Sequence, residues 1–301
     1  MKKVWYCVLL VFLFASCQSN HPVRIDYPLL DTDSAHQNWS ELLAQPGKID
    51  QFKILNTGAV KVPVKGMLNR KKLPQNHPFD KYIWVDVFVF LFHHIEKGWY
   101  IIDTGLDSSF QDKGNITGLL AKNYIKASRQ QVGQNIAAQL QKEQKDIQAI
   151  FFTHLHGDHT AGLPELAPDF PKIVGKGEDH IHIPLLYQSN HLSAKDTLQE
   201  MDWAKGQSIH PFEKVIDIFG DQSFFAISTP GHSSSHTSYV LNTSNETILL
   251  TGDASHTKYG FENNIEPGWV DDQEKAEKSL EQLRVFQQLM PSIRVIYGHQ
   301  L

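Results

Sequence analysis

Cysteine is nearly absent from this sequence. Only Cys7 and Cys17 occur among its 301 residues. The chain beyond Cys17 therefore cannot form an internal disulfide, the usual covalent support of exported proteins. Its stability must come from a hydrophobic core, and a domain of roughly 250 residues can bury a sufficient one.

An excess of positive charge is also lacking. The 28 Lys and Arg residues are outnumbered by 33 Asp and Glu residues, which gives a net charge of −5. This balance leaves no electrostatic footprint for nucleic acid, so we expect no such partner and disfavour a nuclease. Internal repeats and low-complexity tracts are absent as well. Histidine, in contrast, is frequent, with 16 residues.

The first residues have the pattern of an export signal. A basic start precedes an apolar run at residues 4–15, which is shorter than the roughly 20 residues of a membrane-spanning helix. The sequence Phe-Ala-Ser-Cys at residues 14–17 resembles the lipobox of bacterial lipoproteins, with Phe in place of the usual Leu. The resemblance implies a signal peptide at residues 1–16 and a lipidated Cys17 that holds the protein at the membrane of the cell envelope, in the periplasm or at the outer membrane. An uncleaved anchor and ordinary signal cleavage are the alternatives.

The remaining chain alternates between β-prone and helical segments. Residues 17–48 predict a tether followed by a docking segment that contains Trp39, and residues 64–80 predict a polar loop. Apolar runs predict strands at residues 52–55, 59–62, 82–92, 98–105, 149–152, 172–175, 224–228, 237–241, 247–251 and 294–297. Helical patterns occur at about 115–144, 193–205 and about 272–289. Two sheets covered by helices are the simplest packing of these elements.

A cluster of metal-binding residue types follows the apolar strand at residues 149–152. Four such side chains lie within six residues: His154, His156, Asp158 and His159. If the strand continued, its period of two would place the first two histidines on one side. A turn at Gly157 would then bring the other two residues back to the same place. Imidazole and carboxylate together suit a divalent metal such as zinc.

Three later segments repeat one arrangement, in which a glycine and a ligand-type residue follow an apolar strand. These pairs are Gly231-His232, Gly252-Asp253 and Gly298-His299. Together with the first cluster they make seven nitrogen or oxygen ligands, more than one tetrahedral zinc accepts. Seven ligands fit two metals that share a carboxylate and a bridging water, at a separation of roughly 3.5–4 Å. The sequence therefore predicts a two-metal hydrolytic site with a bridging hydroxide as nucleophile.

The order H-x-H-x-D-H, G-H, G-D and G-H resembles the metallo-β-lactamase superfamily from about residue 49 to the end. The resemblance implies a hydrolase domain at residues 49–301 with an α/β fold, a four-layered αββα sandwich that carries two divalent ions, expected to be Zn²⁺, at one edge of its sheets. It implies that His154, His156 and His232 hold one metal, that Asp158, His159 and His299 hold the other, and that Asp253 bridges them. Asp103 resembles a position near the site, and we expect it to orient a ligand histidine.

Within this superfamily the sequence looks most like the N-acyl homoserine lactone lactonases. The resemblance is carried by residues 229–232 followed by His236, and by residues 249–255 followed by Thr257. These lactonases have a Tyr three residues after the bridging Asp, where this chain has His256. We expect His256 to stabilise the developing oxyanion, and Asp158 to pass a proton to the leaving oxygen.

The best single expectation for the substrate is a small ester-like molecule, namely a lactone. A β-lactam, a thioester and a phosphotriester are alternatives, although no basic cluster able to grip the glutathione of a glyoxalase II substrate stands out. A non-hydrolytic di-iron redox protein and a binding or sensor lipoprotein with an inactive site are alternatives of other classes.

Several other side chains are expected to be structural. These are His180 and His182, which form a second H-x-H, together with His236, Trp203 and Trp269. The loop at residues 64–80 either overhangs the site or is a solvated connector.

Overall fold

The computed structural model describes residues 22–29, 38–180, 185–187 and 191–301. The predicted signal peptide, Cys17 and His182 lie outside these ranges. Within them, no helix combines the length and the apolar character needed to cross a membrane.

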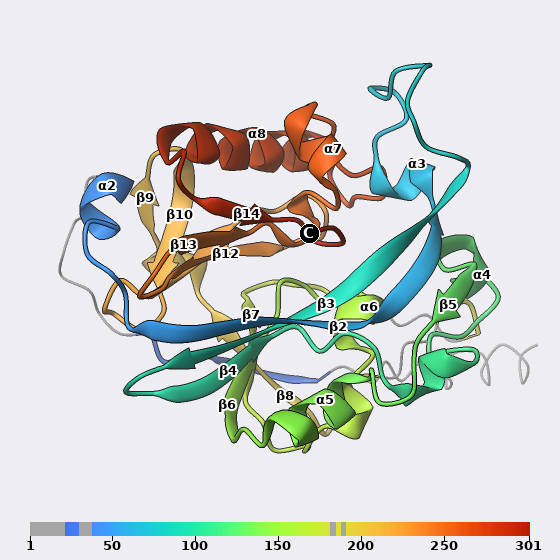
Figure 1. Cartoon of the computed structure of the whole chain (residues 1–301), viewed down its shortest axis with the longest axis horizontal. Helices are drawn as coiled ribbons and strands as arrows, with labels where there is room; N and C mark the ends of the chain where they lie inside the picture. Colours follow the sequence, from blue (N-terminus) through green and yellow to red (C-terminus); the bar gives the residue numbers. More distant parts are fainter. Residues whose placement is uncertain (1–21, 30–37, 181–184, 188–190) are drawn as a thin grey trace, which may run out of the picture.

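Two β-sheets pack face to face, and helices cover the outer face of each (Figure 1). The first sheet has eight strands in the order β1-β8-β7-β6-β4-β3-β2-β5, and the second has six in the order β14-β13-β12-β11-β10-β9. The first contains β1 (Val23–Asp26), β2 (Ile49–Pro63), β3 (Tyr82–His94), β4 (Gly98–Ile102), β5 (Ala127–Arg129), β6 (Ile147–Phe151), β7 (Lys172–Gly175) and β8 (Thr197–Met201). The second contains β9 (Gln207–Ile209), β10 (Phe212–Asp217), β11 (Phe224–Ser228), β12 (Thr237–Asn242), β13 (Thr247–Leu250) and β14 (Arg294–Ile296).

Strand β3 shows how the sequence builds the layers. Its phenylalanines Phe88, Phe90 and Phe92 belong to the core between the two sheets. The alternate residues Val89 and Leu91 belong to the core on the other face, under helix α5 (Ile136–Glu143). Because both faces are buried, the strand is an almost continuous apolar run.

Helix α8 (Gln273–Leu289) covers the second sheet, where Leu280, Leu283 and Phe286 are buried. The Asp272 side chain caps its start by accepting from the backbone N–H of Lys275. The remaining helices are short: α2 (Trp39–Leu42), α3 (Val64–Met67), α4 (Ala121–Tyr124), α6 (Gly157–Thr160) and α7 (Lys258–Glu262), with 3-10 turns η1 (Ser108–Gln111), η2 (Leu163–Glu165), η3 (Trp203–Lys205) and η4 (Gly252–Ala254). The layers helix, sheet, sheet and helix confirm the predicted αββα sandwich.

One predicted helix is confirmed only in part, and another is wrong. The stretch 115–144 contains only α4 and α5, separated by β5, whose backbone pairs with β2 instead of forming helical bonds. The stretch 193–205 contains β8, which pairs in parallel with both β1 and β7. Short apolar patterns fit both the helical period of 3.6 and the strand period of two. Pairing with neighbouring strands therefore determined the secondary structure of these segments.

The chain before residue 49 is part of the packed structure where it is described. Strand β1 adds an edge to the first sheet through β8. The ring of Trp39 lies against Phe212, Phe225 and Phe286 at centroid distances of 6.0, 5.4 and 4.7 Å. This segment therefore contributes to the first sheet and to the core between the second sheet and α8.

Candidate metal centre

The structure brings together all seven residues predicted to bind metal, at one edge of the two sheets. Their ligand atoms fall into overlapping groups of three, each within 4.8 Å. Strand β6 ends at Phe151, so His154 and His156 stand on an extended loop and not on the strand itself. They still converge, because α6 starts directly after them and turns the chain back.

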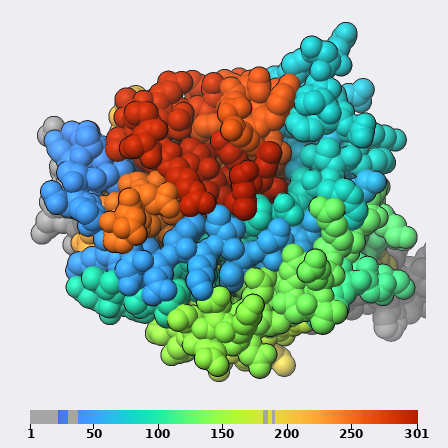
Figure 2. All heavy atoms as spheres, viewed as in Figure 1, coloured from blue at the N-terminus to red at the C-terminus, as the bar shows by residue number. Residues whose placement is uncertain are grey.

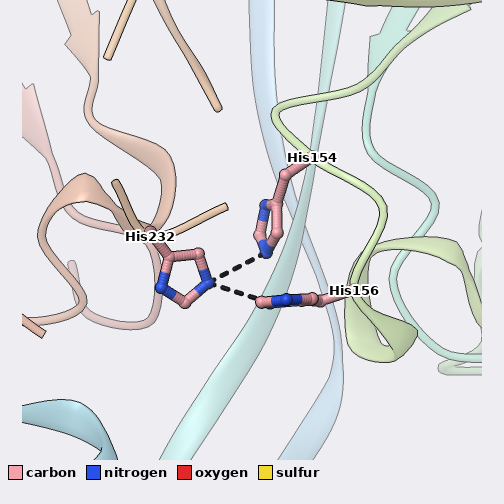
Figure 3. A group of neighbouring side chains, drawn as sticks. All are labelled: His154, His156 and His232. Atoms are coloured by element: carbon pink, nitrogen blue, oxygen red, sulfur yellow. Dashed lines mark hydrogen bonds between the residues drawn. The ribbon is translucent and has the colours of Figure 1, made fainter. Parts of the chain in front are cut away.

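Three histidines form the first group (Figure 3). The Nε2 atom of His232 lies 3.2 Å from Nε2 of His154 and 2.9 Å from Nδ1 of His156. Nitrogen ligands at zinc distances in a tetrahedral site are about 3.3 Å apart. The observed spacing is therefore close to that of a zinc coordination shell.

Asp253 lies between this group and the second. Its Oδ2 atom is 3.4 Å from Nε2 of His232, 3.5 Å from Nε2 of His159 and 3.4 Å from Nε2 of His299. Asp158 completes the second group, with Oδ2 at 3.5 Å from Nε2 of His299. One carboxylate thus faces histidines of both groups.

Three atoms of this cluster are buried without a hydrogen-bond partner among the described residues. They are Nε2 of His159, Oδ1 of Asp253 and Nδ1 of His232. Leaving a polar group unpaired in this way costs about 1–3 kcal/mol, and a bound cation would satisfy Nε2 of His159 and Oδ1 of Asp253. The donor set of imidazole nitrogens and carboxylate oxygens fits zinc or a similar divalent ion.

The protonation of the histidines differs between the groups. Burial lowers the pKa of His154, His156 and His232, so these rings are neutral at neutral pH, as ligands must be. Burial is the largest single influence on the pKa of His159 and of His299 and acts to lower both, but the Asp253 and Asp158 carboxylates, joined at His159 by Asp103, together outweigh it. The pKa of His159 is therefore raised, and that of His299 rises to about 8. A cation bound at the second group would take the place of these protons.

A sequence model of the metallo-beta-lactamase superfamily matches residues 82–299. The chain belongs to the metallo-β-lactamase superfamily. It is a metal-binding hydrolase of that superfamily, with lactonases among its relatives.

Several relatives are N-acyl homoserine lactonases. The enzyme from a Bacillus species is 28% identical over 214 residues, which cover 68% of this chain and 78% of the relative. The lactonase AttM of Agrobacterium fabrum is 27% identical over 157 residues, 51% of this chain and 58% of its own length.

Solved structures share the fold. An N-acyl homoserine lactone hydrolase with N-hexanoyl-L-homoserine at its catalytic metal centre aligns with a TM-score of 0.64 at 23% identity, over 84% of this chain and 94% of that one. The dizinc quorum-quenching lactonase AidC aligns with a TM-score of 0.55 at 17% identity, over 85% and 91%.

A buried acid that the sequence did not reveal joins the loops of the first histidine group. The Glu178 carboxylate accepts hydrogen bonds from the backbone N–H of Leu155, from the Ser233 hydroxyl and from the backbone N–H of Ser235. It therefore connects the loop of His154 and His156 with that of His232. Burial raises the pKa of Glu178 to about 7.

Two glycines at the site are required by close packing. A Cβ atom on Gly298 would lie 2.3 Å from Oδ1 of Asp253. One on Gly157 would lie 2.6 Å from Cδ1 of Ile116 and 2.8 Å from the Tyr187 hydroxyl. The chain does turn at Gly157, as the sequence predicts, and the missing side chain also leaves space for Ile116 and Tyr187.

Two further histidines contact Asp253. His236 lies with Nδ1 2.8 Å from the Thr229 hydroxyl, and its Nε2 accepts from the backbone N–H of Asp253, which is the structural role expected. His256 lies with Nδ1 3.1 Å from the carbonyl oxygen of Met67 and Nε2 3.0 Å from Oδ2 of Asp253. Its donation to a substrate stays a prediction, because both ring nitrogens already have neighbours.

A cavity of about 160 Å³ opens beside the cluster. The predicted ligands on its wall are His156, Asp158, His232, Asp253 and His299, and His256 joins them. The apolar wall comes from Val62, Met67, Leu120, Tyr124, Ile125, Leu155, Tyr187 and Trp269. Part of the stretch 64–80 thus does border the site, through Met67. Trp269, expected to be a packing residue, lines the cavity, whereas Trp203 donates to the Ser235 hydroxyl.

Proposed function

We propose that this protein is a dinuclear metal-dependent hydrolase of small ester-like substrates, with a lactone as the preferred class. The observation that carries the proposal is the position of Asp253, whose Oδ2 faces histidines of two ligand groups on the wall of an apolar cavity. A single shared carboxylate is what a two-metal hydrolytic site needs.

The proposed division of the ligands between two positions is the one that the resemblance to the superfamily implies. His154, His156 and His232 would hold one ion, Asp158, His159 and His299 the other, and Asp253 both. The two ions, with Zn²⁺ favoured by the ligand type, would activate water for attack on the carbonyl carbon and polarise the carbonyl oxygen.

The protein's side chains supply the rest of the chemistry. Asp158 is partly exposed, with 22% of its side chain accessible, and it lines the cavity. It is therefore placed to pass a proton to the leaving oxygen. A neutral donor is also present, because burial raises the pKa of the Tyr187 phenol and the hydroxyl accepts from the Gly157 backbone, leaving its own proton free.

The lactone preference has two supports. The lactonases among the relatives act on N-acyl homoserine lactones. The cavity wall is mostly apolar, with Met67, Leu120 and Ile125 beside the ligand residues, and suits an uncharged ring with an acyl substituent.

A hydrolysis screen on the chain without residues 1–17 tests the proposal. Lactones, β-lactams, thioesters and phosphotriesters would be compared side by side, with metal content measured by elemental analysis. We expect about two metal ions per chain and the highest kcat/KM with lactones. Full activity after complete metal removal, or lactone turnover below that of all three other classes, contradicts it.

We further propose that the protein is exported and tethered to the cell-envelope membrane through Cys17. The support is the basic and apolar pattern of residues 1–17. Membrane fractionation with metabolic lipid labelling should show a lipidated wild type and a soluble Cys17→Ser variant. Equal recovery of both in the soluble fraction excludes the tether.

A further inference from the structure

A second, larger cavity lies next to the metal cavity. It has a volume of about 820 Å³ and is formed by the end of β2, the start of β3, the neighbourhood of α4 and the stretch 64–80. Figures 1 and 2 show that the segment between α3 and β3 projects from the body of the protein. We call this cavity the outer groove.

The outer groove is positively charged although the protein is not. Four cationic residues and one acidic residue line it: Lys65, Arg70, Lys81, Lys126 and Asp80. The chain as a whole carries a net charge of −5. Lys65 lies on α3, Arg70 in the loop that follows α3, Lys81 directly before β3, and Lys126 between α4 and β5.

The four cations have no ion-pair partner in the part of the chain that the structure describes. The contrast is Lys72, which pairs with Glu266 at 2.8 Å and with Glu277 at 2.7 Å. Lys81 and Lys126 lie over the Tyr82 ring, at 5.4 and 5.9 Å from its centroid, and Nζ of Lys126 also donates to the carbonyl oxygen of Lys122. Four positive charges in a concave site that contains one carboxylate, Asp80, leave an excess of positive charge, which attracts an anion.

Two aromatic residues join the outer groove to the metal cavity. Tyr124 and Trp269 line both, and their ring centroids are 4.9 Å apart. The Trp269 ring packs closely against Gly66, where a Cβ atom would lie 2.4 Å from the ring. A substrate with its reacting carbonyl beside Asp253 can therefore extend past these rings into the outer groove.

We propose that the outer groove binds an anionic group, a carboxylate or a phosphate, at the far end of the substrate whose ester or lactone lies in the metal cavity. This assignment rests on the proposed hydrolase function and narrows its substrate class. The concave shape and the aromatic wall shared with the metal cavity favour a small anionic substituent of the substrate over an anionic membrane surface.

The test compares three lactones with acyl chains of equal length that end in a carboxylate, a phosphate monoester or a carboxamide. The carboxamide has nearly the shape of the carboxylate and no charge. We expect kcat/KM to be about ten-fold higher for at least one anion than for the carboxamide, and the ratio to fall as salt screens the groove. The better of the two anions identifies the group.

Single variants locate the effect. Lys81→Gln, Lys126→Gln and Arg70→Gln should each lower the anion-to-carboxamide ratio by about three-fold or more, through a higher KM. The matched control is Lys142→Gln, an exposed lysine on α5 that lines neither cavity, and it should leave the ratio unchanged.

The outcomes separate this inference from the function it rests on. If the carboxamide lactone is hydrolysed and the anion-to-carboxamide ratio of kcat/KM is near one, the outer groove does not bind the anion, and the proposed hydrolase function still stands. Absence of metal-dependent hydrolysis of all three overturns the function itself. A third outcome would assign the groove to a membrane and overturn the substrate proposal. In it, the protein cosediments with phosphatidylglycerol vesicles, and Lys81→Gln and Lys126→Gln abolish this binding but leave the anion-to-carboxamide ratio unchanged.

Discussion

The Oδ2 atom of Asp103 lies 2.8 Å from Nδ1 of His159. The same carboxylate accepts from the backbone N–H and the hydroxyl of Thr153, and Asp103 has a positive φ of 61°. A strained backbone that points a buried carboxylate at a histidine indicates a positioning role. The contact holds the His159 proton on Nδ1 and directs Nε2 toward Asp253 with a free lone pair.

Asp103→Asn should weaken metal binding at the second group. The carboxamide nitrogen would face Nδ1 of His159, force the proton onto Nε2 and remove the lone pair that a metal needs. We expect a loss of about 10–100-fold in affinity for one of the two ions, measured by calorimetric titration of metal into the stripped protein.

The control for this substitution is Asp107→Asn. Asp107 is also buried, but it contacts Ser109 and Asn115 and no predicted ligand. If both variants lose the same affinity, the effect is general destabilisation and the positioning role is wrong.

Asp253→Ala should remove metal and activity together. Without the shared carboxylate, Nε2 of His159 and Nε2 of His299 lose their central neighbour, at 3.5 and 3.4 Å. We expect less than one ion per chain by elemental analysis and a fall in kcat of at least about 10²-fold. Asp217→Asn, at the distant end of β10, serves as the control. Wild-type kcat with two ions bound would refute the bridging assignment.

Tyr187 and His256 are the two candidates for donating a hydrogen bond to the substrate, and substituting them should have different effects on metal binding. Tyr187→Phe should lower kcat by about 10–100-fold with metal content unchanged, because the hydroxyl that is removed accepts from the Gly157 backbone at the cavity, and the ring keeps its contact with Tyr124. His256→Phe should lower metal affinity as well, because Nε2 of His256 lies 3.0 Å from Oδ2 of Asp253. A His256→Phe protein that keeps both ions and loses only kcat would restore His256 as the oxyanion donor.

The sequence predicted the site better than its surroundings, for a physical reason. Each pair of a glycine and a ligand residue follows soon after an apolar strand. The local sequence pattern alone therefore places His232, Asp253 and His299 near strand ends. Glu178 and Tyr187 reach the site from segments without such a signal, and their roles exist only through contacts distant in the chain. The outer groove is a mixed case, because Lys65, Arg70 and Lys81 are close in the chain and the fold adds Lys126 to them.

Glu178 should make the stability of the protein depend on pH between about 4.5 and about 7. Burial raises its pKa from 4.5 to about 7, so the folded state holds the proton more tightly than the unfolded state. The free energy of unfolding therefore decreases as pH rises through this range, by on the order of 3 kcal/mol, and the decrease is complete above pH 7. Glu178→Gln cannot titrate and lacks this slope.

Urea unfolding of wild type and Glu178→Gln at a series of pH values measures the difference, in which the titration of all other groups cancels. We expect the wild type to lose stability relative to the variant as pH rises from 4.5 to 7, and the difference to be constant above that. Glu262→Gln, an exposed residue with 57% of its side chain accessible, should give curves parallel to the wild type. Parallel curves for Glu178→Gln would mean that its three hydrogen bonds hold the carboxylate ionised, and that the junction between the histidine loops is charged at all pH values tested.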